Sequence, residues 1–301
     1  MPVDFLTDEQ YQSYAKYPVT LTQDQLDKYF YLDDKDKELI DVCRRDYNKL
    51  GYALQLTTVR FIGTFLSNPI DVPNEVVCYL AKQLVVELPV DIARYMERKA
   101  TRLAHSSEIK TLFDYQDLSG IWGYRLTRWL YFQAWFGNER PSILFERCTL
   151  WLISRKVLLP GISTLTVLIA KVRDRVSKRL WQRLTLLVNT DQKEQLENLL
   201  LVPDSKRYSK LDELKKGPTH ISSTGLVRAL QRYQYIRDLG IGKINIGNIP
   251  KAKINHLARY VTVSWAPSIA RMPDDRRIAV LFSFAYVYET KALDDALDLL
   301  E

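Results

Sequence analysis

The spacing of apolar residues along this 301-residue chain is helical almost everywhere. Val172, Val176, Leu180 and Leu184 recur every four residues in the segment KVRDRVSKRLWQRL, and such a ridge is typical of one buried face of a helix. The strict apolar–polar alternation that marks a half-buried strand is nearly absent. The sequence therefore predicts a mainly α fold made of several small helical subdomains.

Helix-start signals and polar connecting segments divide the chain further. Thr7 with Gln10, and Thr22 with Gln25, have the spacing of capping boxes, while Pro73 begins another helix. The final helical pattern reaches the last residue without a C-cap signal, which predicts that the intact protein continues beyond it. The predicted subdomains are residues 1–70, 71–118, 119–203 and 204–301, with the first two containing helix-turn-helix-like pairs and the third basic and rich in tryptophan.

Positive charge is concentrated in one part of the chain. The formal net charge is +7, and residues 120–190 hold 12 basic residues, 3 acidic residues and five of the six tryptophans. Residues 1–50 hold 7 basic and 11 acidic residues. We interpret the tryptophans as core residues, with base stacking as the lesser alternative. The charge favours a nucleic acid or an anionic surface as partner.

A row of cations runs parallel to the apolar ridge, one residue offset from it. Lys171, Arg175, Arg179 and Arg183 follow the same four-residue step, with Lys178 beside them, over roughly 18 Å of helix. A solvated helix face usually mixes charges of both signs, and this row does not. The row faces either a polyanion or water, and its spacing alone leaves both possibilities open.

Two further basic groups lie on helix-turn-helix-like pairs. The first pair joins residues 36–46 to 50–66, and the second joins 91–104 to a helix at 107–116 that follows a Ser106–Ser107 cap. In a helix-turn-helix the second helix enters the major groove, although any helical bundle also contains helix pairs. The candidate contacts on the first pair are Arg44, Arg45, Lys49 and Arg60, and those on the second are Arg94, Arg98, Lys99 and Arg102.

A polar basic connector precedes a helix that Ser222 or Ser223 caps. Free N–H groups at a helix start, with cations before them, suit a phosphate oxygen. A mobile basic linker is the alternative interpretation. The candidate contacts here are Lys206, Arg207, Lys215 and Lys216.

The residues offer no basis for catalysis. His105, His220 and His256 have no neighbouring ligand at metal-site spacing, and each is interpreted as a surface or capping histidine. The loop sequence GIGK lacks the hydroxyl residue that a phosphate-binding loop needs after its lysine. Three widely spaced cysteines, a polar acidic start and no long apolar run predict a cytoplasmic chain with no membrane contact.

Several sequence blocks occur in an order that covers essentially the whole chain: FLTDEQ, LDDKDKELI, RRDYNKLGYALQLTTVRFIGTFL, DVPNEVVCYLAKQL, RPSILFERCTLWLISRKVLLPG and LARYVTVSWAPSIARMPDDRRIAVLFSFAYVYETKALDDALDLL. Together they make the chain resemble the N-terminal region of transposases of the replicative, bacterial Tn-three transposon family. The resemblance implies that double-stranded DNA at the terminal inverted repeats of a transposon is the partner, and that the full-length protein forms a homodimer in the bacterial cytoplasm.

The resemblance also implies where the chemistry lies. Family members cut and join DNA with an Asp-Asp-Glu triad and divalent metal in a C-terminal RNase-H-like domain, which would lie beyond Glu301. We therefore expect no catalytic residue, no metal and no cofactor in this chain. Two alternatives remain, an assembly module or a stand-alone regulator that competes for transposon ends. Charge and spacing nominate Arg44, Arg60, Arg98, Lys99 and Arg102 for base edges or adjacent phosphates, and the Lys171–Arg183 row for phosphates alone.

Overall fold

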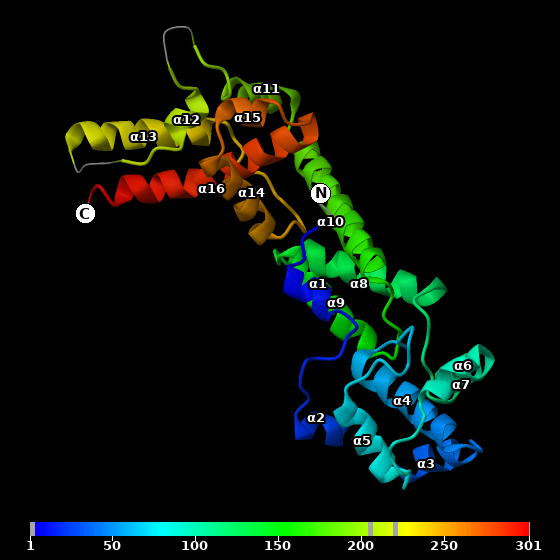
Figure 1. Ribbon diagram of the computed structural model, residues 1–301. Helices are drawn as coiled ribbons and strands as arrows, with labels where there is room; N and C mark the ends of the chain where they lie inside the picture. The colour runs from blue at the N-terminus through cyan, green and yellow to red at the C-terminus, as the bar shows by residue number, and fades with distance from the viewer. Residues whose placement is uncertain (1–3, 204–206, 219–221, 301) are drawn as a thin grey trace. The chain divides into compact units, whose positions relative to one another are not determined.

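The computed structural model describes residues 4–203, 207–218 and 222–300, and helices dominate it (Figure 1). Over these residues the only β interaction is an isolated parallel bridge between Gln116 and Val157. The predicted mainly α class is therefore confirmed. The chain forms two compact units, the first made of Met1–Leu130 with Arg140–Ala170, and the second of Tyr131–Glu139 with Lys171–Glu301.

The first unit holds the N-terminal helices. Thr7 and Thr22 form the predicted capping boxes at the starts of α1 and α2, so these sequence signals are confirmed. Two helices, α8 (Gly120–Phe136) and α10 (Ile162–Leu186), begin in this unit and end in the second. The others are α1 (Asp8–Ser13), α2 (Gln23–Tyr29), α3 (Asp34–Asp41), α4 (Asp46–Ile62), α5 (Asn74–Gln83), α6 (Ala93–Glu97), α7 (Lys99–Leu112) and α9 (Pro141–Ile153).

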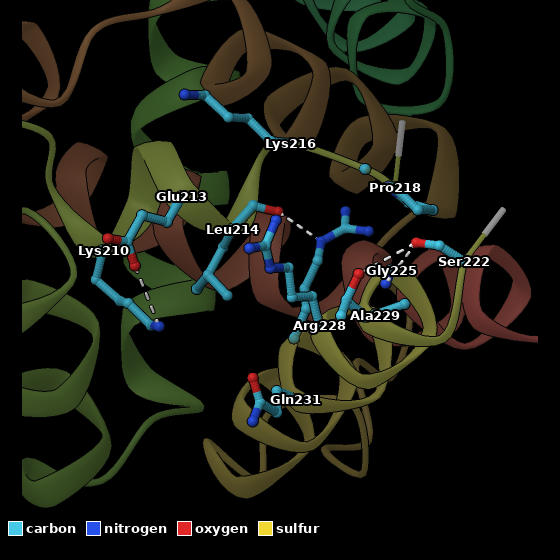
Figure 2. Close-up of a pocket in the computed structure, with 13 residues that line it drawn as sticks. Lys210, Glu213, Leu214, Lys216, Pro218, Ser222, Gly225, Arg228, Ala229 and Gln231 are labelled. Atoms are coloured by element: carbon cyan, nitrogen blue, oxygen red, sulfur yellow. Dashed lines mark hydrogen bonds and ion pairs between the residues drawn. The ribbon is translucent and has the colours of Figure 1, made fainter. Parts of the chain in front are cut away.

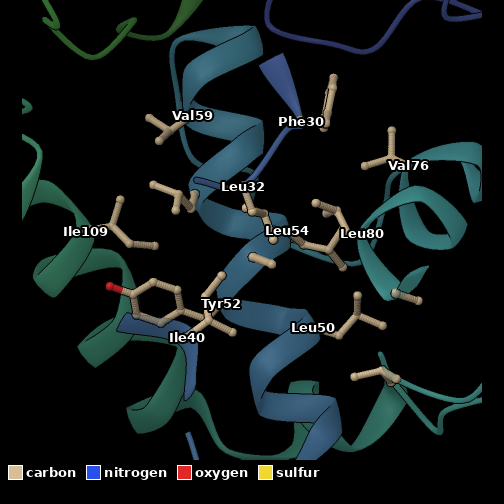
Figure 3. Close-up of a cluster of buried hydrophobic side chains, with 14 of the residues drawn as sticks. Phe30, Leu32, Ile40, Leu50, Tyr52, Leu54, Val59, Val76, Leu80 and Ile109 are labelled. Atoms are coloured by element: carbon tan, nitrogen blue, oxygen red, sulfur yellow. The ribbon is translucent and has the colours of Figure 1, made fainter. Parts of the chain in front are cut away.

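Helix α4 is the centre of the first unit's core. Leu50, Tyr52 and Leu54 on this helix are buried among side chains from α3, α5 and α7, including Leu80 and Ile109 (Figure 3). Each fully buried side chain of this size contributes about 1.5–3 kcal/mol of transfer free energy. Among the buried polar side chains of α4, Gln55 and Thr57 have hydrogen-bond partners, whereas the Tyr52 hydroxyl has none among the described residues.

Two glycines set the packing of α4. Gly51 lets the ring of Tyr95 lie against the helix, since a Cβ at this position would meet the ring at 2.5 Å. Gly63 ends the helix in the left-handed conformation, with φ of 85°, and a Cβ there would also meet Ile153 at 2.7 Å. A left-handed C-terminal residue is strained for any residue with a side chain, so glycine supplies the stop.

The predicted boundary at Ser106–Ser107 is wrong. Helix α7 runs without interruption from Lys99 to Leu112, and the break between α6 and α7 falls at the extended residue Arg98. Instead of capping a new helix, Ser106 donates its hydroxyl hydrogen to the carbonyl of Leu103, 3.0 Å away. A serine inside a helix can bond back to the preceding turn in this way. The predicted pair 91–104 and 107–116 is therefore replaced by a short α6 followed by a longer α7.

The second unit is built around its last helix. Helix α16 packs against α13, α14 and α11, and α13 and α16 run side by side in Figure 1. Its buried face includes Leu281, Phe282 and Phe284. The helices that lie wholly in this unit are α11 (Thr190–Asn198), α12 (Lys210–Leu214), α13 (Ser223–Asp238), α14 (Lys251–Val263), α15 (Ala266–Ala270) and α16 (Asp274–Leu297).

Part of the predicted polar connector is folded. Residues Lys210–Leu214 form α12, and Ser209 caps its start by accepting a hydrogen bond from the N–H of Asp212 at 3.2 Å. Leu211 and Leu214 are buried, so this short helix is anchored to the second unit. Two apolar residues three positions apart are enough to fix a single turn when a core lies beneath them.

Candidate nucleic-acid interface

The second unit presents the basic row of α10 on its surface. Val172, Val176, Leu180 and Leu184 are all buried, as the four-residue ridge predicted. The neighbouring cations are exposed, and they are Lys171, Arg175, Lys178, Arg179 and Arg183. The helix therefore anchors one face in the core and holds a line of cations outward on a rigid support.

Few acidic groups neutralise this row. Lys178 pairs with Asp174 at 2.8 Å, and the guanidinium of Arg183 lies 5.2 Å from the centre of the Trp135 ring. Lys171, Arg175 and Arg179 form no ion pair with the residues that the structure describes. A shallow depression of about 550 Å³ follows the row and contains three of its cations with Asp174 and Gln182. Such a surface attracts phosphates because its charge is uncompensated.

A second group of cations in the same unit was missed at the sequence level. Arg173 is half-buried on α10, and its buried Nη1 atom has no hydrogen-bond partner within the described chain. Burial lowers its pKa. On α14, Lys253 donates a hydrogen bond to the carbonyl of Gly137 at 2.5 Å, and burial, followed by the charge of Arg173, lowers the Lys253 pKa to about 8.

His256 and Arg259 extend this group along α14. The pKa of His256 is lowered by burial first and then by the positive charges of Lys253, Arg173 and Arg259. These like charges repel one another, and a bound anion would reduce the repulsion. The steps from 253 to 256 and from 256 to 259 are each three residues, so a search for basic stripes at helical spacing would have found these α14 residues.

In the first unit, the cations of α3 and α4 differ in their availability. Arg44 and Arg45 are exposed between the two helices, with Arg45 over the ring of Tyr47 at 5.9 Å. Lys49 pairs with Asp41 at 2.7 Å. The exposed pair therefore lies at a turn, whereas Lys49 is already bound to a carboxylate.

Arg60 is held inside the first unit. Its two terminal nitrogens donate to the two oxygens of Asp36 at 2.7 and 2.6 Å, and the Asp36 side chain is only 1% exposed. The guanidinium also lies 5.1 Å from the centre of the Phe113 ring. A bidentate arginine–carboxylate pair of this kind has fixed geometry. Arg60 is thus already paired with a buried carboxylate, and the base-edge contact suggested by its place in the sequence stays a prediction.

The cations of α6 and α7 gather around the break between these helices. Arg98 and Lys99 are exposed at the start of α7, where the free N–H groups of a helix add to their positive charge. Arg94 pairs with Asp91 at 3.2 Å. Arg102 is half-buried and contacts the sulfur of Met96 at 3.5 Å, so its guanidinium is partly occupied.

The basic residues predicted in the connector before α13 also differ in whether their charges are free to bind a ligand. Arg207 and Lys216 are exposed, and Lys216 lies 4.5 Å from the centre of the Tyr208 ring. Lys215 is instead internal, because its ammonium binds Asp212 at 3.0 Å and the carbonyl of Ser264 at 2.6 Å. Lys206 lies outside the described residues.

The histidines that the sequence singled out include His105 in the first unit. His105 is part of a half-buried network in which its Nδ1 lies 2.9 Å from the Tyr95 hydroxyl and its Nε2 lies 3.8 Å from the sulfur of Cys43. This internal position differs from the surface or capping role expected of His105. The described residues contain no group of three or more potential metal ligands. No helix among them is long and apolar enough to cross a membrane.

These features define an all-helical protein whose second unit carries an exposed, largely unpaired basic surface. The chain belongs to the family described as a domain of unknown function (DUF4158), whose model matches residues 5–172. It is also homologous over its whole length to the N-terminal region of Tn-three family transposases, so the resemblance drawn from the sequence blocks is confirmed.

Three relatives illustrate this homology. The transposase for transposon gamma-delta of Escherichia coli (strain K12) is 42% identical over 302 residues, covering 100% of this chain and 30% of the relative. The transposase for transposon Tn1546 of Enterococcus faecium is 25% identical, covering 98% of this chain and 30% of the relative. The transposase for transposon Tn501 of Pseudomonas aeruginosa is 24% identical, covering 92% of this chain and 28% of the relative. The chain thus spans about 30% of the length of these relatives.

Proposed function

We propose that this chain binds double-stranded DNA at the terminal inverted repeats of a transposon, as the N-terminal part of a transposase. The observation that carries the proposal is the row of exposed cations on α10, in a protein homologous to transposases. A line of cations roughly 18 Å long can face several phosphates, because B-DNA carries one negative charge per about 1.7 Å of its axis when both strands are counted.

In this proposal the two units have different tasks. The α10 row binds phosphates together with the group formed by Arg173, Lys253, His256 and Arg259. These contacts set the register of the protein on the duplex. Exposed cations of the first unit, Arg98 and Lys99 at the start of α7 and Arg44 and Arg45 between α3 and α4, supply base-edge or adjacent phosphate contacts. Arg60 is left out of this set, because its guanidinium is already bound to Asp36.

Salt dependence tests the electrostatic part of the proposal. If about six phosphates are neutralised, the logarithm of the binding constant should fall against the logarithm of salt concentration with a slope near −5. The measurement is a gel-shift titration of the chain on a duplex of its own transposon end and on a scrambled duplex, at several salt concentrations. Footprinting on the same two duplexes tests sequence specificity.

Two results would count against the proposal in different ways. A flat salt response would remove the phosphate contacts, and equal footprints on both duplexes would remove sequence-specific recognition. A matched control is Arg237→Ala, which deletes an exposed cation on α13 that lies outside the α10 row. This variant should bind both duplexes within about twofold of the parent chain, because one remote surface charge contributes little.

A second candidate function is assembly with another copy of the full-length protein. Ile121 and Tyr124 on the first turns of α8 are 61% and 66% exposed, which is unusual for large apolar side chains that lie close together on one helix. Burial of such residues in a homodimer would stabilise it. Light scattering after size exclusion tests this role, since a chain that stays monomeric at high concentration, with and without DNA, would oppose it.

A further inference from the structure

The second unit contains a cavity of about 690 Å³ beside α12 and the start of α13. Its lining is basic, and Figure 2 labels Lys210 and Lys216 from the α12 side and Arg228 from α13. Arg232 of α13 also lines the cavity. Among the described residues of the lining, Glu213 is the only acidic one. A concave surface with this excess of positive charge attracts anions.

The start of α13 opens into this cavity. Ser222 caps the helix by accepting a hydrogen bond from the N–H of Gly225 at 3.1 Å, and Thr224 and Gly225 both line the cavity. The N–H groups of the first helical residues have no acceptor within the helix. They carry the positive end of the dipole of a 16-residue helix. An anion placed here would accept hydrogen bonds from backbone groups as well as from side chains.

Arg232 lines the cavity and carries a buried donor that has no partner in the described part of the chain. Its side chain is 8% exposed, its Nε donates to the carbonyl of Leu214 at 2.8 Å, and its Nη1 donates to Asp295 at 2.5 Å. The remaining Nη2 atom is buried and has no hydrogen-bond partner among the described residues. A buried donor without a partner is costly, so an acceptor at this position would stabilise the folded protein.

The charges around the cavity are not balanced. Lys210 pairs with Glu213 at 3.3 Å, and Arg232 pairs with Asp295. Arg228 is exposed, and the Lys216 ammonium lies 4.5 Å from the centre of the Tyr208 ring. Neither residue forms an ion pair with the residues that the structure describes. Two positive charges thus remain for a ligand, enough to offset the single negative charge of a backbone phosphodiester or the roughly double charge of a phosphate monoester.

We propose that this cavity binds a phosphate group through Arg228, Lys216, Arg232 and the N–H groups at the start of α13. The inference rests on the proposed function in one respect, namely that the phosphate belongs to the DNA backbone. A free phosphate or the phosphate of a mononucleotide would use the same donors. The cavity would then hold one particular phosphate, whereas the α10 row offers a continuous surface to many.

Phosphate interference on the 301-residue chain tests the backbone source. Single phosphates of the transposon-end duplex are replaced in turn by neutral methylphosphonates, and each duplex is titrated with the parent chain, with Arg228→Ala, and with Lys216→Ala/Arg228→Ala. Neutralising the phosphate that enters the cavity should weaken parent binding about fivefold to tenfold, and Arg228→Ala should lose the same factor on the unmodified duplex. The variant should show no further loss at that one position.

The control variant is Arg237→Ala, because Arg237 is also exposed on α13 but lies nine residues beyond Arg228, about 13 Å along the helix. It should keep the parental interference pattern. Arg232→Lys keeps the positive charge near Asp295 but removes Nη2, and it should weaken binding at the same phosphate position. Thermal unfolding of every variant checks that the second unit remains folded.

A second arm distinguishes the source of the phosphate. Calorimetric titration with inorganic phosphate and with a mononucleotide, without DNA, should give weak binding that Arg228→Ala removes. Free-phosphate binding without any effect on interference would assign the cavity to a free anion. The proposal is overturned if Arg228→Ala and the double variant keep the parental affinities for both duplex and free phosphate. If the parent chain fails to bind the duplex at all, the proposed function fails, and the free-phosphate arm still decides the cavity.

Discussion

Helices α4 and α10 both carry basic residues, but those of α4 are paired with carboxylates and most of those on the α10 row are not. On α4, Lys49 is bound to Asp41 and Arg60 to the buried Asp36. On α10, Lys171, Arg175 and Arg179 are exposed and unpaired within the described residues. Residues 1–50, which pack around α4, hold 11 acidic residues, whereas residues 120–190 hold only 3. The local supply of carboxylates, more than the number of cations, therefore decides which basic residues stay unpaired.

The largest effect should come from breaking the internal pair of the first unit. Asp36→Ala leaves the partly buried Arg60 guanidinium without its carboxylate, and we expect the free energy of unfolding to fall by about 3–5 kcal/mol. Urea denaturation followed by circular dichroism measures this loss. Arg175→Ala on α10 is the matched control and should change stability by less than about 0.5 kcal/mol.

The double variant Asp36→Ala/Arg60→Met sharpens this result. Because removing both partners leaves no buried charge unpaired, the double variant should lose less stability than the sum of the two single changes. Additive losses would mean that the two residues act separately. The contrast between paired cations on α4 and unpaired cations on α10 would then no longer explain the stability of the first unit.

The next largest effect concerns the exposed cations of α10. Replacing Lys171, Arg175, Arg179 and Arg183 together by alanine should weaken binding to the transposon-end duplex about 100-fold, or about 3 kcal/mol. The salt slope should become shallower by about 3–4, because each lost phosphate contact removes about 0.9. Gel-shift titration at several salt concentrations gives both values.

This variant should remain as stable as the parent chain, since the four side chains are exposed and the buried ridge is unchanged. Unchanged affinity and slope would contradict the assignment of the row to phosphate binding. A scrambled duplex should lose affinity by the same factor, because phosphate contacts carry no base sequence information.

A smaller effect is expected where α10 resembles α4. Asp174 pairs with Lys178 at 2.8 Å and is the only acidic residue within the row. Asp174→Asn frees Lys178 and removes a negative charge from the surface, so affinity for duplex DNA should rise about twofold to fivefold. Fluorescence anisotropy with a labelled duplex measures the change. Weaker binding would indicate that Asp174 orients Lys178 toward the DNA.

The two histidines with lowered pKa values should respond differently to pH. In the second unit, a phosphate near His256 would offset the positive charges of Lys253, Arg173 and Arg259 and raise the His256 pKa in the complex. The complex then holds more protons than the free chain, and affinity should rise as pH falls below about 6.5. His256→Gln should flatten this rise in an anisotropy titration. A pH response that survives the substitution would place His256 away from the DNA.

In the first unit, burial lowers the pKa of His105, which faces Tyr95, Cys43 and Tyr52. The unfolded chain therefore binds a proton more readily than the folded chain. The stabilisation that neutral His105 gives the folded chain is fully present above about pH 6.5. It is lost as the pH falls through the lowered pKa that His105 has in the folded chain. Unfolding free energies at a series of pH values, for the parent chain and for His105→Gln, measure the contribution. An identical pH profile in both proteins would contradict it.

Some features could be predicted because they depend on residues close together in the chain. The ridge from Val172 to Leu184 and the cations beside it follow from one helical period, and the capping boxes at Thr7 and Thr22 depend on residues three positions apart. The Ser106–Ser107 boundary failed because a serine hydroxyl can cap a helix or bond back within one. Local sequence does not distinguish these two outcomes.

The sequence by itself determined that the chain is helical, where its positive charge is concentrated, and which family it belongs to. Only the tertiary structure decided which cations are available. It brings Asp36 to Arg60, Ser264 to Lys215, and Lys253 near Arg173, and these partners lie 24, 49 and 80 residues apart. The physical reason is that the charge of a side chain is fixed by its chemistry, whereas its desolvation and its partners depend on contacts between distant segments.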